Sequence, residues 1–256
     1  MIKNIRVLIL LYILLMVAVG SWLTKARSTG WDKPLNVIVY AINADGRAAT
    51  QKYIDEIEKT DFFDIEEFFQ REAAVYSLPL KKPIDISYAG ELKEKPPLPS
   101  RGSSQLSIML WSLKLRYWVW KNDNYPYPQD ATIFVLYFDP KQTQTVAHSL
   151  GLQKGLIGIV NAFASKKMKK ENHVIIAHEL LHTVGAIDKY DPKTNSPLYP
   201  IGYANPEQSP LHPQKKAEIM AGRIAITENK AQQPEKLKQV VIGELTAIEI
   251  NWLKVN

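Results

Sequence analysis

The residue types best suited to chemistry lie in one short stretch of the 256-residue chain, HELLHTVGAID at positions 178–188. His178 and His182 are four residues apart, so on a helix both imidazoles project from the same face, one turn apart. Two neutral imidazole nitrogens placed in this way can bind one zinc ion. Glu179 is displaced by one residue around the helix, where its carboxylate can accept a proton from water instead of binding the metal.

A third ligand is expected from the turn that follows. Gly185 can adopt a positive φ, end the helix and direct the next residues back toward the metal, which places Asp188 as a carboxylate ligand. Three protein ligands leave one coordination position open, as in catalytic zinc sites. The sequence therefore predicts Zn²⁺ as the cofactor, His178, His182 and Asp188 as its ligands, and Glu179 as the catalytic base.

The other candidate ligands fit this pattern less well. The chain has no cysteine, so a metal has to be held by His, Asp or Glu, and disulfides and cysteine nucleophiles are excluded. Asp191 would require a wider turn than Asp188, and His212 is a weaker alternative. His148 and His173 fit no ligand spacing and are expected to be exposed or to lie in the core.

The stretch at 178–188 resembles the motif of the metzincin metallopeptidases, His-Glu-x-x-His-x-x-Gly-x-x-His followed by a Met-turn. Because Asp188 stands at the third ligand position, it is most similar to the snapalysin type. Met220, within AEIMAG at 217–222, resembles the Met-turn beneath the metal. The resemblance implies a twisted mixed sheet, an active-site helix, the Met-turn and a C-terminal helix. It also implies an edge strand beside the substrate, a role that we assign to residues 155–162.

The elements that must position these residues alternate between strands and helices. Continuous apolar, β-branched runs predict buried strands, and apolar residues at helical spacing predict amphipathic helices. Together they predict an α/β or α+β layered sheet. The expected strands are 35–42, 84–88, 131–138 and 155–162, and the expected helices are 48–59, 65–76, 104–121, about 172–185 and about 237–253. In helix 104–121, six apolar residues that include Leu106, Leu113 and Trp120 are expected to pack in the core.

The N-terminus carries an apolar segment at 5–23, close to the length that spans a bilayer. Lys3 and Arg6 precede it and would keep residues 1–4 in the cytoplasm. The segment is predicted to be a transmembrane anchor or a signal peptide cleaved after Gly20. Residues 24–33 are expected to be a linker, and residues 34–256 a metallopeptidase domain at the cell membrane, facing the periplasm or extracellular space, or secreted after cleavage.

Charge adds little to this prediction. The net charge is +6, and the lysines at 166, 167, 169 and 170 indicate a solvated surface, since no nucleic-acid-binding module accompanies them. The predicted function is a zinc-dependent peptidase that acts on peptides or proteins, with Tyr199 or Tyr203 as candidates for oxyanion stabilisation. The alternatives are a zinc hydrolase of non-peptide or cell-wall amides, and a non-catalytic membrane-anchored metal-binding or interaction module.

Overall fold

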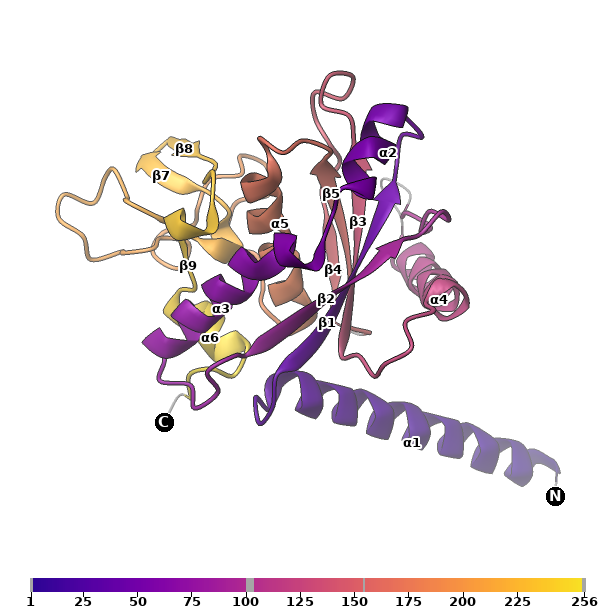
Figure 1. Ribbon diagram of the computed structural model, residues 1–256. Helices are drawn as coiled ribbons and strands as arrows, with labels where there is room; N and C mark the ends of the chain where they lie inside the picture. Colours follow the sequence, from indigo (N-terminus) through magenta and orange to yellow (C-terminus); the bar gives the residue numbers. More distant parts are fainter. Residues whose placement is uncertain (1, 100–103, 154, 255–256) are drawn as a thin grey trace.

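A computed structural model describes residues 2–99, 104–153 and 155–254. Its centre is a five-stranded sheet in the order β2-β1-β3-β5-β4 (Figure 1). The strands are β1 (Leu35–Asn43), β2 (Ile84–Glu91), β3 (Ala131–Phe138), β4 (Leu150–Leu152) and β5 (Ile157–Phe163). The pairs β1–β2, β1–β3 and β3–β5 are parallel, and β4 pairs with β5 antiparallel. The predicted α/β class is thus confirmed as a mixed sheet with helices.

The edge of this sheet differs from the sequence prediction. Residues 157–163 do not form an edge strand, because β5 pairs with β3 on one side and β4 on the other. Almost all of β5 is buried, as expected of an inner parallel strand. The strand at the edge is the three-residue β4, which is half-buried and too short to give a periodic signal.

One face of the sheet is covered by α2 (Ala48–Asp55), α3 (Phe63–Val75) and α5 (Lys169–Thr183) (Figure 1). Val37, Val39 and Ala41 of β1 project to this side and join one large apolar core with α3 and α5. The three helices lie close to their predicted ranges, since their apolar residues recur at helical spacing.

The other face is covered by α4 (Gln105–Asn122), against the alternate β1 residues Ile38, Tyr40 and Ile42. The helix forms as predicted, but its predicted core face is wrong. Trp111 and Leu115 are the buried residues of α4. The six residues assigned to the core are exposed: Leu106, Met109, Leu110, Leu113, Tyr117 and Trp120. Because α4 is apolar on both sides, its periodicity did not identify the side that contacts the sheet.

The C-terminal helix predicted at 237–253 is also wrong. The segment contains a 3₁₀ turn η3 (Leu237–Gln239), a short strand β9 (Val240–Val241) and a helix α6 limited to Glu244–Glu249. β9 is held by pairing with β6 (Ala217–Glu218), so tertiary pairing replaces the helix up to Gly243. A hairpin of β7 (Ile224–Thr227) and β8 (Lys230–Gln232) lies between these segments in the chain.

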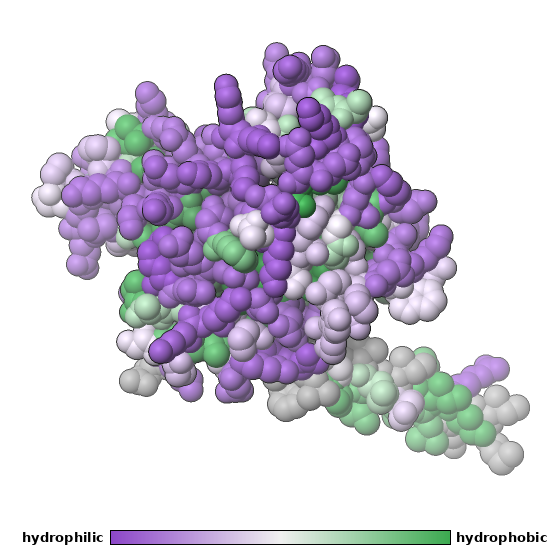
Figure 2. Space-filling view, in the orientation of Figure 1, coloured by the Kyte–Doolittle hydropathy of each residue, from purple (hydrophilic) through white to green (hydrophobic). Residues whose placement is uncertain are grey.

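The N-terminal segment forms helix α1 (Ile2–Thr29), which extends away from the body (Figure 1). The apolar side chains described on it, between Ile5 and Val19, are exposed, and they contrast with the mainly hydrophilic surface of the body in Figure 2. In the described part of the chain, no helix combines the length and hydropathy that a membrane span requires. The expected linker 24–33 is helical up to Thr29, and Trp31 is buried, with its Nε1 donating to Ile250 O at 2.6 Å.

Candidate metal centre

The two histidines occupy the C-terminal half of α5, whose opposite side is buried. Val174, Leu180 and Leu181 pack in the core beneath the sheet. His178 Nδ1 lies 2.8 Å from Ile219 O, and His182 Nδ1 lies 2.8 Å from Ala186 O. Because a carbonyl oxygen only accepts hydrogen bonds, each Nδ1 carries the proton and donates it. Both Nε2 atoms are therefore unprotonated in the neutral rings, and they converge to 3.1 Å.

The turn after α5 places Asp188 against this pair. Gly185 has φ +113°, as its predicted role requires. The chain reverses there, with Ala186 N donating to Leu181 O at 3.0 Å. Asp188 Oδ1 then lies 3.2 Å from His178 Nε2 and 3.0 Å from His182 Nε2. Two ligand atoms about 2.0–2.1 Å from a tetrahedral zinc are about 3.3–3.4 Å apart, so these three atoms could hold one such ion.

Glu179 lies beside these atoms but is oriented differently. Ligand atoms of Glu179 and the two histidines all lie within 4.8 Å of one another. The Glu179 side chain is buried, and its Oε2 has no hydrogen-bond partner among the described residues. Burial raises the pKa of Glu179, although the neighbouring imidazoles act in the opposite direction. A buried carboxylate oxygen without a partner is costly and is typical of a functional group that awaits a proton or ligand.

The imidazoles of His178 and His182 influence the pKa of Asp188, and the carboxylate of Asp188 influences the pKa of His178. Burial lowers the pKa of His178, but hydrogen bonding to Asp188 and the charge of Glu179 outweigh it, so the pKa lies above its usual value. Burial likewise acts to raise the pKa of Asp188, but the two histidines hold it well below its usual range. Asp188 is thus ionised, as a metal ligand must be.

The segment around Met220 forms the support beneath His178. It is a 3₁₀ turn, η2 (Ile219–Ala221), followed by Gly222 at φ +68°. Met220 is fully buried, and its carbonyl accepts from Lys189 N at 2.9 Å. The turn therefore holds the carbonyl of Ile219 toward the first histidine and is joined to the segment that carries Asp188.

Three supporting residues were not identified from the sequence. Gly151 of β4 lies against α5, where a Cβ would be 2.4 Å from His182 Cβ and 3.2 Å from Glu179 Oε2. Glu218 accepts from Ala221 N at 2.9 Å, Gly243 N at 3.2 Å and Thr246 Oγ1 at 2.7 Å, which fixes the η2 turn. These contacts join segments far apart in sequence, so local spacing gave no signal for them.

Tyr190 is the third such residue, two positions beyond Asp188. Burial and then the negative charge of Asp188 raise the pKa of Tyr190 to about 12. Its hydroxyl is therefore protonated at neutral pH and lies in the field of the Asp188 carboxylate. Its closeness to Asp188 in the sequence was the signal that could have identified it.

The alternative ligands and the predicted tyrosines have other partners. His212 Nε2 lies 2.9 Å from the hydroxyl of Tyr203, whose ring packs on Tyr199. Asp191 Oδ1 accepts from the backbone N of Lys193 at 2.7 Å in a local turn. The structure thus brings together His178, Glu179, His182 and Asp188, and does not add His212 or Asp191 to them.

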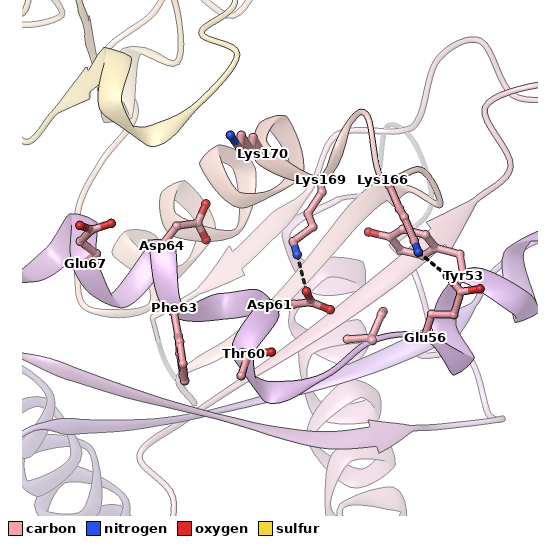
Figure 3. A pocket seen from close by; sticks show the side chains of 11 residues that line it. Tyr53, Glu56, Thr60, Asp61, Phe63, Asp64, Glu67, Lys166, Lys169 and Lys170 are labelled. Atoms are coloured by element: carbon pink, nitrogen blue, oxygen red, sulfur yellow. Dashed lines mark hydrogen bonds and ion pairs between the residues drawn. The ribbon is translucent and has the colours of Figure 1, made fainter.

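A cavity of about 780 Å³ lies elsewhere, between the N-terminal end of α5 and the α2–α3 region (Figure 3). Two of its lysines face acidic partners: Lys166 Nζ is 2.7 Å from Glu56 Oε2, and Lys169 pairs with Asp61. Its lining contains none of the four residues of the candidate metal centre. In these two ion pairs the opposite charges neutralise one another.

No family model matches the chain, and a comparison with curated proteins also finds no match. The interpretation of this centre therefore rests on its geometry and donor atoms.

Proposed function

We propose that the protein is a zinc-dependent peptidase of the metzincin type. The observation that carries the proposal is the convergence of His178 Nε2, His182 Nε2 and Asp188 Oδ1, with the unpartnered carboxylate of Glu179 beside them. Two imidazoles and one carboxylate match the donor preference of a catalytic zinc site. When bound there, zinc would acidify water and polarise a carbonyl group.

The chain's own residues supply the remaining chemistry. Ile219 O and Ala186 O orient the two imidazoles, so that their Nε2 lone pairs face the same point. Glu179 accepts the proton of the attacking water and passes it to the nitrogen of the leaving amine. Its burial raises its pKa, which brings the carboxylate closer to the value that suits a general base at neutral pH.

The sheet edge supports a peptide as the substrate. The edge strand β4 packs on α5 through Gly151, directly against Glu179 and His182. An extended peptide can add to such an edge through main-chain hydrogen bonds, which would bring its backbone next to the general base. The antiparallel edge strand and the buried Met220 turn also fit the metzincin resemblance. The predicted placement outside the cytoplasmic membrane, through residues 5–23, belongs to the same proposal.

A purely structural metal site is disfavoured by the same geometry. A structural zinc site is usually closed by four protein ligands and needs no general base. Here the buried Oε2 of Glu179 remains without a partner among the described residues. A general base for hydrolysis would explain the unpartnered Glu179 carboxylate beside the three metal-binding atoms, whereas a structural metal site would not need it.

The test combines zinc content and peptide hydrolysis on one preparation of the full chain. We expect one bound zinc and hydrolysis of a mixed peptide library that a chelator abolishes and added zinc restores. Glu179→Gln should keep the zinc but lose about 10²–10⁴ in rate, the contribution of a general base. Glu171→Gln, on the same helix, is the matched control and should hydrolyse normally. Wild-type rates for Glu179→Gln would refute the proposed mechanism.

A further inference from the structure

Helix α4 is apolar on both of its faces, and among the residues that the structure describes only one face has a partner in the fold. The inner face packs Trp111 and Leu115 into the core, and Trp111 Nε1 donates to Pro97 O at 2.8 Å. The outer face presents six large apolar side chains to solvent: Leu106, Met109, Leu110, Leu113, Tyr117 and Trp120. We call this set the α4 stripe. Its members follow helical spacing, at about 100° a residue, and therefore share one side.

The members of the α4 stripe are all exposed, and they lie next to one another on one side of the helix. Leu113 is 59% exposed, Tyr117 63% and Trp120 76%. The rings of Tyr117 and Trp120 lie 5.8 Å apart, so they form one continuous aromatic surface. Contiguous exposed apolar surface of this kind marks an interaction site.

Basic residues border the stripe, and α4 contains no acidic residue. At about 100° a residue, Lys114 and Lys121 lie along one flank and Arg116 along the other. Both lysines are exposed. A helix with an apolar side bordered by lysine and arginine and containing tryptophan has the composition of helices that lie in the surface of an anionic membrane.

The position of α4 agrees with such a surface. Helix α1, with its exposed apolar side chains, leaves the body toward the side that α4 covers (Figure 1). A chain held at a membrane by its apolar N-terminal segment would bring α4 close to the same bilayer. Lysine ammonium groups on the border could then reach lipid phosphates while the stripe enters the interface.

We propose that α4 is a second membrane contact, which docks its outer face onto the surface of a bilayer containing anionic lipids. The docking rests on the proposed membrane placement through residues 5–23, but it can be tested separately from the proposed hydrolysis, because the stripe and the metal centre lie on opposite faces of the sheet. It would fix the orientation of the domain on the membrane, which a single helical tether cannot do.

The absence of cysteine allows a clean test with single labels. Leu113→Cys and, as the control, Val75→Cys on α3 (68% exposed) are made in the full chain and labelled with an environment-sensitive fluorophore. The proteins are reconstituted into phosphatidylcholine vesicles with or without phosphatidylglycerol. With the anionic lipid, the label at 113 should shift to the blue and be shielded from aqueous iodide, and the label at 75 should not change.

The border lysines provide the second measurement. Lys114→Gln and Lys121→Gln should each lower the ratio of docked to undocked label at 113 about fivefold, whereas Lys167→Gln, remote from α4, should have no effect. Equal iodide quenching of both labels in anionic vesicles would overturn the proposal. A blue shift at 113 that appears without vesicles and grows with protein concentration would also overturn it, because the stripe would then join two copies of the chain.

Discussion

Helices α5 and α4 cover opposite faces of one sheet and depart from ordinary packing in opposite ways. Helix α5 encloses polar groups: Glu179 is buried and His178 nearly so. Helix α4 leaves apolar groups such as Leu113 and Trp120 in solvent. A buried polar group and an exposed apolar surface are the two departures that carry information about function. Under the two proposals made above, one face of the sheet would serve chemistry and the other would serve attachment.

The largest effect that this comparison predicts is on metal binding by α5. His182→Ala removes one of the three converging donors, so we expect zinc and peptide hydrolysis to be lost together, with activity at the level of the chelated protein. Zinc analysis and hydrolysis on the same sample measure both. His148→Ala is the control, since His148 is exposed and outside the site. Full zinc retention in His182→Ala would show that α5 does not hold the metal through this pair.

The second prediction compares how much the two faces of α4 contribute to the free energy of unfolding. Leu115 is fully buried and Leu113 is 59% exposed, although both are leucines of one helix. Leu115→Ala should lower the free energy of unfolding by about 2–5 kcal/mol, and Leu113→Ala should change it by less than about 0.5 kcal/mol. Chemical denaturation measures both. If the two variants lose equal stability, the stripe has a partner within the folded chain.

The third and smallest prediction concerns the turn that ends α5. Gly185 has φ +113° and Gly46 has φ +71°, so the backbone strain of an alanine at either position costs about 1–2 kcal/mol in stability. At Gly185 the added Cβ would also lie 2.7 Å from Nε2 of the flexible Gln153 side chain. Zinc affinity should fall only for Gly185→Ala, because that turn carries Asp188. Gly46→Ala, where a Cβ meets no atom within 4 Å, is the matched control. Unchanged zinc affinity in Gly185→Ala would mean that Asp188 does not depend on this turn.

The sequence predicted what local spacing determines. His178 and His182 lie one turn apart on α5, and Gly185 and Asp188 follow within six residues. The structure brings the side chains of the two histidines and Asp188 together. The runs of β1, β3 and β5 predicted buried strands, because strands covered on both faces are continuously apolar.

The remaining features depend on contacts between distant segments. Which side of α4 meets the sheet could not be decided from a helix with two apolar sides. Val240 and Val241 lie within the predicted C-terminal helix, but their pairing with β6 makes them strand β9. Gly151 and Glu218 act through residues tens of positions away, and no pattern in the sequence links them to the histidines.

The contacts of Glu218 have a consequence for the order in which the site is completed. His178 is oriented by Ile219 O, the turn containing Ile219 is capped by Glu218, and Glu218 is held by Gly243 and Thr246. During synthesis, both histidines leave the ribosome more than sixty residues before Thr246. A nascent chain that has not reached Gly243 therefore contains the whole ligand sequence but lacks the support that orients its first imidazole. The proposed metal centre would therefore be completed only after the segment containing Gly243 and Thr246 has been made.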